Sequence, residues 1–92
     1  MAIFYVLQES VSYDFLSDLK LGHWDGYFDP TTEQYSLCEK FSSRKAAFLA
    51  RAKAEELLRA EFPNDPEAAF NVKVLEVRTE VIKKIVHTAK TL

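Results

Sequence analysis

The stretch SRKAAFLARAKAEELLRAEF, residues 43–62, decides the fold of this chain. Alanine, leucine, arginine, lysine and glutamate dominate it, and all of these are strong helix formers. Ser42 or Ser43 offers the hydroxyl that an N-cap needs, and Pro63 cannot continue a helix. The stretch therefore predicts one main helix over residues 43–62.

This helix has two distinct faces. At 100° per residue, four alanines and two leucines share one stripe, namely Ala46, Ala47, Ala50, Ala54, Leu57 and Leu58. A stripe of side chains that small lets a helix approach a sheet closely. Glu55 and Arg59 form a favourable i,i+4 pair on the solvent side. Phe48 is expected near the opposite face, away from the core.

Three strands are expected before the helix. Residues 2–8, AIFYVLQ, are rich in β-branched and aromatic residues and predict a buried strand in the middle of a small sheet. Residues 24–28 fit a short strand. Residues 35–41, YSLCEKF, alternate in polarity and predict another strand that runs into the helix.

The C-terminal part, FNVKVLEVRTEVIKKIV over residues 70–86, is dominated by β-branched side chains. Its alternation changes phase at Leu75, which predicts a β-bulge. Residues 70–79 are expected to be strand, whereas residues 80–87 fit either strand or helix. The tail beyond His87 is expected to be frayed. Together these elements predict an α+β fold, with an antiparallel sheet of three to five strands and the 43–62 helix on one face.

Size and composition set further limits. The 92 residues form one domain, 1–92, and 48% hydrophobic with 28% charged residues is typical of a globular protein. The single cysteine excludes an internal disulfide and favours a reducing, cytoplasmic compartment. The N-terminal apolar run is too short for a signal peptide or a membrane span, so no membrane partner is expected.

The sequence carries no readable catalytic apparatus. Its two glycines, Gly22 and Gly26, are too few for a glycine-rich phosphate loop. Cys38, His23 and His87 are single and widely spaced, which excludes the common zinc motifs. We therefore predict no catalytic residue, no metal and no cofactor, and expect a protein that is not an enzyme.

Residues 13–35 are both aromatic and acidic. This segment holds six of the twelve aromatic residues and five acids against Lys20. Residues 1–39 carry seven acids and one base, a net charge of −6, and residues 40–92 carry seven acids and eleven bases, a net charge of +4. Aromatic residues supply the hot spots of interfaces, and acids steer a surface toward basic partners. The predicted partner-binding residues are Trp24, Asp25, Tyr27, Phe28 and Asp29, with Phe48 second.

Two alternatives stay open. Trp24, Tyr27 and Phe28 could instead cap a small core. The helix region 44–59 could bind nucleic acid, with phosphate contacts from Lys40, Arg44, Lys45 and Arg51 and stacking on Phe48. The overall charge of −2 and the acids on the same helix weigh against nucleic acid. A protein partner with a basic surface is therefore the first expectation.

The order of elements resembles that of small, mostly uncharacterised proteins of bacteriophages and prophages. The residues that carry this resemblance are FYVLQES, then WDGYF, then YSLCEKFSSRKAAFLARAKAEELL, then VKVLEVRTEV. The likeness covers most of the chain as a pattern of elements, and the segment after Thr79 is longer than usual. It implies an accessory protein that docks on a host enzyme or defence complex, as anti-CRISPR inhibitors do. No functional residue can be carried over. A small core and a β-rich C-terminus also allow a homodimer.

Overall fold

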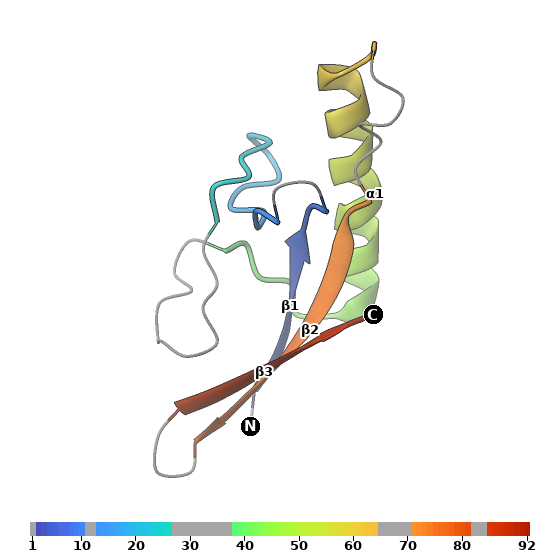
Figure 1. Ribbon diagram of the computed structural model, residues 1–92. Helices are drawn as coiled ribbons and strands as arrows, with labels where there is room; N and C mark the ends of the chain where they lie inside the picture. The colour runs from blue at the N-terminus through green and yellow to red at the C-terminus, as the bar shows by residue number, and fades with distance from the viewer. Residues whose placement is uncertain (1, 11–12, 27–37, 65–70, 82–84) are drawn as a thin grey trace.

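The computed structural model describes residues 2–10, 13–26, 38–64, 71–81 and 85–92. Its elements follow in the order β1 (Ala2–Gln8), α1 (Arg44–Glu61), β2 (Lys73–Val81) and β3 (Ile85–Thr91). The three strands form one antiparallel sheet, and α1 lies along one face of it (Figure 1). The predicted α+β fold class is confirmed.

Helix α1 begins and ends where its sequence signals place it. The Ser43 hydroxyl accepts the N–H of Ala46 at 3.1 Å, which satisfies one free donor of the first turn. At the other end Phe62 donates its N–H to the carbonyl of Leu58, and Pro63 follows. The observed bounds therefore differ from the predicted 43–62 by one residue at each end.

The strand order is β1-β2-β3, so the N-terminal strand is not the central one. That expectation was wrong because the C-terminal part of the chain forms a hairpin and pairs its first arm with β1. The tail beyond His87 is not frayed either: β3 continues to Thr91, and Leu92 donates its N–H to the carbonyl of Val74. Of the open stretch 80–87, the described residues lie in β2 or β3.

No β-bulge interrupts β2 in the described ladders. Its register with β1 runs unbroken from Ala2–Thr79 to Gln8–Lys73, and its register with β3 from Leu75–Thr91 to Val81–Ile85. The phase change at Leu75 has another cause, because both faces of the sheet are covered there. Val74 is buried on the α1 side and its neighbour Leu75 is buried on the other side.

The main core lies between α1 and the sheet. We call it the helix-side core, and its buried members are Leu7, Leu16, Ala47, Ala50, Ala54, Leu58, Val72 and Val74. The alanines let α1 approach β1 and β2 closely. Phe48 is half-buried and packs against this core, so its expected position on the opposite face of the helix was wrong. The buried stripe is centred on Ala47, Ala50 and Ala54, which brings Phe48 to its margin.

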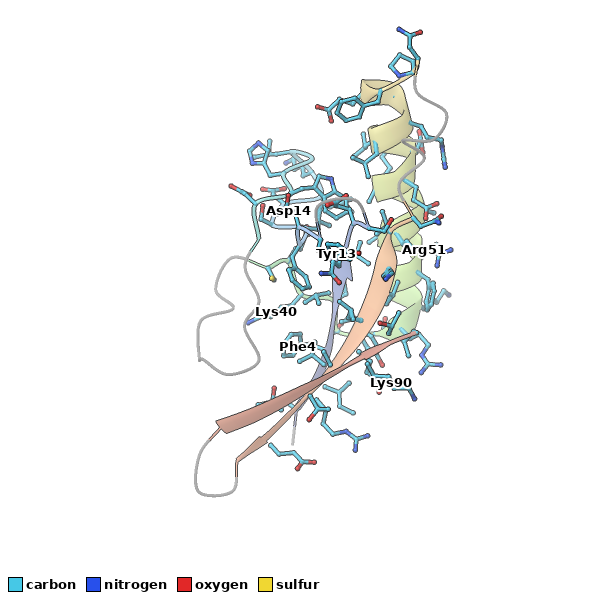
Figure 2. All side chains as sticks on the ribbon, in the orientation of Figure 1. Phe4, Tyr13, Asp14, Lys40, Arg51 and Lys90 are labelled. Carbon is cyan, nitrogen blue, oxygen red and sulfur yellow. The ribbon has the colours of Figure 1, made fainter. Side chains whose placement is uncertain are left out.

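A second, smaller cluster covers the other face of the sheet. This far-side cluster consists of Val6, Cys38, Leu75 and Val77, with Phe4 and Phe15 packed against it. Lys40 extends over it, with its Nζ 5.3 Å from the centroid of the Phe4 ring (Figure 2). The segment that brings Cys38 and Lys40 to this face therefore turns an open sheet face into a covered one.

Two strand predictions fail in their described parts. Residues 38–41 form no strand: only Phe41 bridges to β1, by exchanging two hydrogen bonds of 2.9 and 2.8 Å with Tyr5 before the chain turns into α1. Residues 24–26 likewise make only an isolated bridge, between Gly26 and Phe15. Residues 35–37 and 27–28 lie outside the described residues.

Candidate binding groove

Residues 14–26 form a tight loop that the sheet holds in place. Leu16 donates its N–H to the carbonyl of Leu7 on the outer edge of β1, and accepts the N–H of Glu39 at its own carbonyl, both at 2.9 Å. Within the loop, Asp18 and His23 pair as an isolated bridge. The turn between them needs the φ of +67° that Gly22 adopts, a conformation that other residues rarely enter. Backbone hydrogen bonds within the loop and to β1 thus fix the conformation of the loop.

A groove of about 380 Å³ separates this loop from the C-terminal half of α1. Leu16 and Leu58, both buried, belong to its lining together with Ala54. The loop adds Leu19 and Trp24, which are half-buried, and Leu21, which is largely exposed. On the α1 side, Leu57 also belongs to the lining. The groove is therefore lined by apolar and polar groups together, and it is open to solvent on the side where Leu21 is 64% exposed.

Charged groups lie beside these apolar side chains. Lys20, Gly22, His23 and Glu61 complete the lining. Asp25 follows Trp24 directly and is exposed, and the Ser17 hydroxyl donates a hydrogen bond to its carboxylate. This bond lowers the pKa of Asp25 below its usual value, so the group stays ionised across the physiological range. The groove thus combines leucine and tryptophan side chains with polar and charged groups.

The predicted partner-binding residues that the structure describes lie in different surroundings. Trp24 packs against the helix-side core and also lines the groove, and its predicted role in partner binding stays a prediction. Asp25 is exposed beside it. Phe48 lies outside the groove lining, and the Arg51 guanidinium stacks over its ring at 5.3 Å. Tyr27, Phe28 and Asp29 lie outside the described residues, so their predicted roles stay predictions.

Several groove residues were not singled out from the sequence. Leu16, Leu19 and Leu21 come from the LSDLKL stretch, whose leucines have no fixed helical or strand period. Leu57 was assigned to the core stripe, and it is half-buried at the edge of that stripe. The spacing of Ala54, Leu57, Leu58 and Glu61 was the available signal, because it places four positions on one side of the last two turns of α1.

The basic residues proposed for nucleic-acid binding do not form one free surface. Arg44 pairs with Glu76 of β2 at 3.4 Å, and Arg51 pairs with Glu55 at 3.6 Å. Figure 2 shows Lys40 beside Phe4 and Arg51 on α1, with the strands between them. Lys45 is exposed. Because nearby carboxylates offset part of this positive charge, the geometry favours a role other than phosphate contact, and nucleic-acid binding stays a prediction.

Cys38 is 7% exposed, and its burial raises the pKa of the thiol to about 11. We expect it to react with a thiol reagent at pH 8 about 100-fold more slowly than a thiol with a pKa of 9.0, because the thiolate is the reacting form.

The raised pKa of Cys38 also makes stability depend on pH. Between pH 9 and pH 11 the thiol of the unfolded chain loses its proton while the thiol of the folded chain keeps it. The contribution of this group to stability is therefore present below pH 9 and is lost as the pH rises toward 11. Labelling rates measured against pH, with the unfolded chain as the control, check both statements. A native rate equal to the unfolded one at pH 8 would contradict them.

Comparisons of the chain with protein-family models, with curated proteins and with solved structures found no match. In the described part of the chain, no group of three or more histidine, cysteine, aspartate or glutamate side chains is placed to hold a metal ion. No helix among the described residues has the length and apolarity that a membrane crossing requires.

Proposed function

We propose that this protein is a non-enzymatic protein-binding module, and that the groove between residues 16–24 and α1 is its docking surface. The observation that carries the proposal is the position of Trp24, which lies among leucines in the lining of an open groove, next to an ionised aspartate. Tryptophan in such a position is the residue type that most often dominates the binding energy of an interface. The groove's partner is a protein segment with one apolar anchor residue between basic residues.

The size of the groove supports an apolar anchor. A volume of about 380 Å³ is enough for one or two large side chains and lies at the lower end for a small-molecule pocket. Leu16 and Leu58 would contact the end of the anchor, and the exposed Leu21 would lie against its base. Enclosing such an anchor removes apolar surface of both partners from water, which stabilises a complex by roughly 25 cal/mol per Å².

The charge around the groove supports basic flanks. Among the described residues, Glu61 and Lys20 line the groove, and Asp18 and Asp25 belong to the loop that forms one side of it. This local excess agrees with the net charge of −6 over residues 1–39. Carboxylates at the rim of an interface increase the rate of association with basic partners and suppress acidic ones. The likeness to small phage proteins supports a host protein as the source of the segment, and an inhibitory or accessory role.

A display library of random peptides tests this docking surface without a known partner. We expect peptides selected on the wild-type protein to share an apolar residue flanked by lysine or arginine. Leu21→Asp should weaken their binding at least tenfold, because it places a carboxylate against the base of the anchor. Binding is measured by surface plasmon resonance against immobilised wild-type and variant proteins.

Leu49→Asp is the matched control. Leu49 is 65% exposed, almost the same as Leu21 at 64%, but it lies on α1 outside the groove lining. The selected peptides should bind Leu49→Asp as tightly as wild type. Equal binding to Leu21→Asp, or equal losses in both variants, would place the docking surface elsewhere.

A further inference from the structure

The two outer edges of the sheet differ. Segments of the chain itself cover the outer edge of β1: Tyr5 exchanges two hydrogen bonds with Phe41, and the carbonyl of Leu7 accepts the N–H of Leu16. Among the described residues, no strand or isolated bridge pairs with the outer edge of β3. In Figure 1 the far end of the β2–β3 hairpin extends away from the loop at residues 14–26 and from α1. In the described part of the chain, one edge of the sheet is therefore closed and the other is open.

The hydrogen bond from Leu92 to Val74 identifies which backbone groups face outward from β3. In an antiparallel ladder, hydrogen-bonded and non-hydrogen-bonded pairs alternate. In the observed register, the hydrogen-bonded pairs after Val74–Leu92 are those of Lys90 with Glu76 and Thr88 with Arg78. The N–H and C=O groups of the alternate residues, which include His87, Ala89 and Thr91, therefore point away from β2. They form a row of donors and acceptors to which no other described residue of the chain bonds.

We propose that this edge pairs with β3 of a second copy of the chain, antiparallel and in the register that uses all seven residues. Thr88 then lies opposite Thr88 of the second copy on a two-fold axis. His87 lies opposite Ala89 and Ile85 opposite Thr91, and these are the pairs whose backbone groups point outward. Antiparallel pairing of a strand with itself is self-complementary, as a two-fold interface requires. The two sheets join into one of six strands.

Charge complementarity selects a second copy as the occupant. Lys90, which projects from β3 in Figure 2, shares a groove of about 390 Å³ with Glu76, Arg78, Glu80 and Thr88, so these side chains lie on one face of the hairpin. In the proposed register Lys90 lies opposite Val86 of the second copy, whose own neighbour across the ladder is Glu80. Each Lys90 is thus a direct neighbour of Glu76 of its own chain, and it lies on the same face as Glu80 of the other, about 10 Å away across Val86. No lysine lies opposite a lysine.

The proposed interface is small. Pairing one seven-residue edge buries less surface than the roughly 1,200 Å² of a standard stable interface, so we expect a weak dimer with a dissociation constant in roughly the micromolar to millimolar range. Sedimentation velocity over a concentration series to about 1 mM measures it. Ala89→Pro removes an outward N–H and should abolish self-association, whereas Ala89→Thr keeps the N–H and should not. A proline at this position leaves the bonds between β2 and β3 in place.

A charge exchange tests the partner and the register together. Lys90→Glu alone places a carboxylate near Glu80 of the second copy, and Glu80→Lys alone places a lysine near Lys90. Each variant should self-associate roughly tenfold more weakly than wild type. A one-to-one mixture of the two variants restores opposite charges at both contacts, and should associate roughly tenfold more tightly than either variant alone.

Amide hydrogen exchange supplies a second readout. Exchange at Ala89 and Thr91 should slow as the protein concentration rises, whereas exchange at Thr88, already bonded to β2, should not change. A wild-type chain that stays monomeric at all concentrations overturns the proposal. The proposal is also overturned if Lys90→Glu and Glu80→Lys self-associate as tightly as wild type, or if their mixture associates no more tightly than either variant alone. If Ala89→Pro unfolds the chain, the charge-exchange experiment still tests whether β3 pairs with β3 of a second copy.

Discussion

Leu16→Ala is expected to lower the free energy of unfolding by about 2–5 kcal/mol. This is a large part of the total free energy of unfolding, which is roughly 5–14 kcal/mol for a domain of 92 residues. Leu16 is 0% exposed although it belongs to a loop. Its side chain packs in the helix-side core, and its backbone bonds to β1 and to Glu39. Truncation leaves a cavity where the loop, the sheet and α1 meet. Chemical denaturation followed by circular dichroism measures the loss.

Leu21→Ala is the matched control for this substitution. Leu21 lies five residues further along the same loop and is 64% exposed. Its truncation should change the free energy of unfolding by no more than about 0.5 kcal/mol. If both variants lose the same stability, the loop does not pack as the structure describes, and the groove that it forms with α1 is wrong as well.

Val74→Asp and Leu75→Asp should each lower the free energy of unfolding by roughly 4 kcal/mol or more, enough to leave much of the chain unfolded. These neighbours point to opposite faces of β2, Val74 into the helix-side core and Leu75 into the far-side cluster. Neither cluster offers a charged partner to a new carboxylate among its buried members. Both substitutions therefore place a charge in apolar surroundings, with Lys40 at the margin of the far-side cluster as the one cation described near position 75.

Lys73→Asp is the control, because Lys73 precedes Val74 on β2 and is exposed. It should stay within about 1 kcal/mol of wild type. Thermal unfolding of the three variants separates the two descriptions of β2. A strand with one solvated face would tolerate one of the two aspartates at 74 and 75. Tolerance of either would contradict the two covered faces.

The local elements were predictable because local signals determine them. Ser43, the alanine-rich stretch and Pro63 define α1 within one residue at each end. The β-branched content of residues 2–8 and 70–79 predicts β1 and much of β2. The pairing of these strands was not predictable in the same way, since the central place of β2 depends on a hairpin whose second arm, IVHTAKT, fits a helix or a frayed end as well.

The error at Leu75 arose because segments distant in the sequence cover a face of the sheet, and the error at Phe48 arose from the position assigned to the core stripe of α1. The apparent phase change at Leu75 was interpreted as a bulge because one solvated face was assumed, whereas Cys38 and Phe15 cover that face. Phe48 was placed opposite the core because the stripe was centred on all six apolar positions. The sequence singled out Trp24 and Asp25, but the leucines that complete the groove come from a loop and a helix that only the tertiary structure brings together.

Trp24 is the single tryptophan of the chain, so tryptophan fluorescence reports on one side chain, which lines the groove and packs against the helix-side core. The most direct test of the docking surface is a titration of the protein with a peptide selected on it, followed by the emission of Trp24. A saturable shift is expected for wild type and for Leu49→Asp, and at least tenfold weaker binding for Leu21→Asp. A peptide that binds without changing the emission of Trp24, or that binds Leu21→Asp as tightly as wild type, would contradict the groove as the binding site.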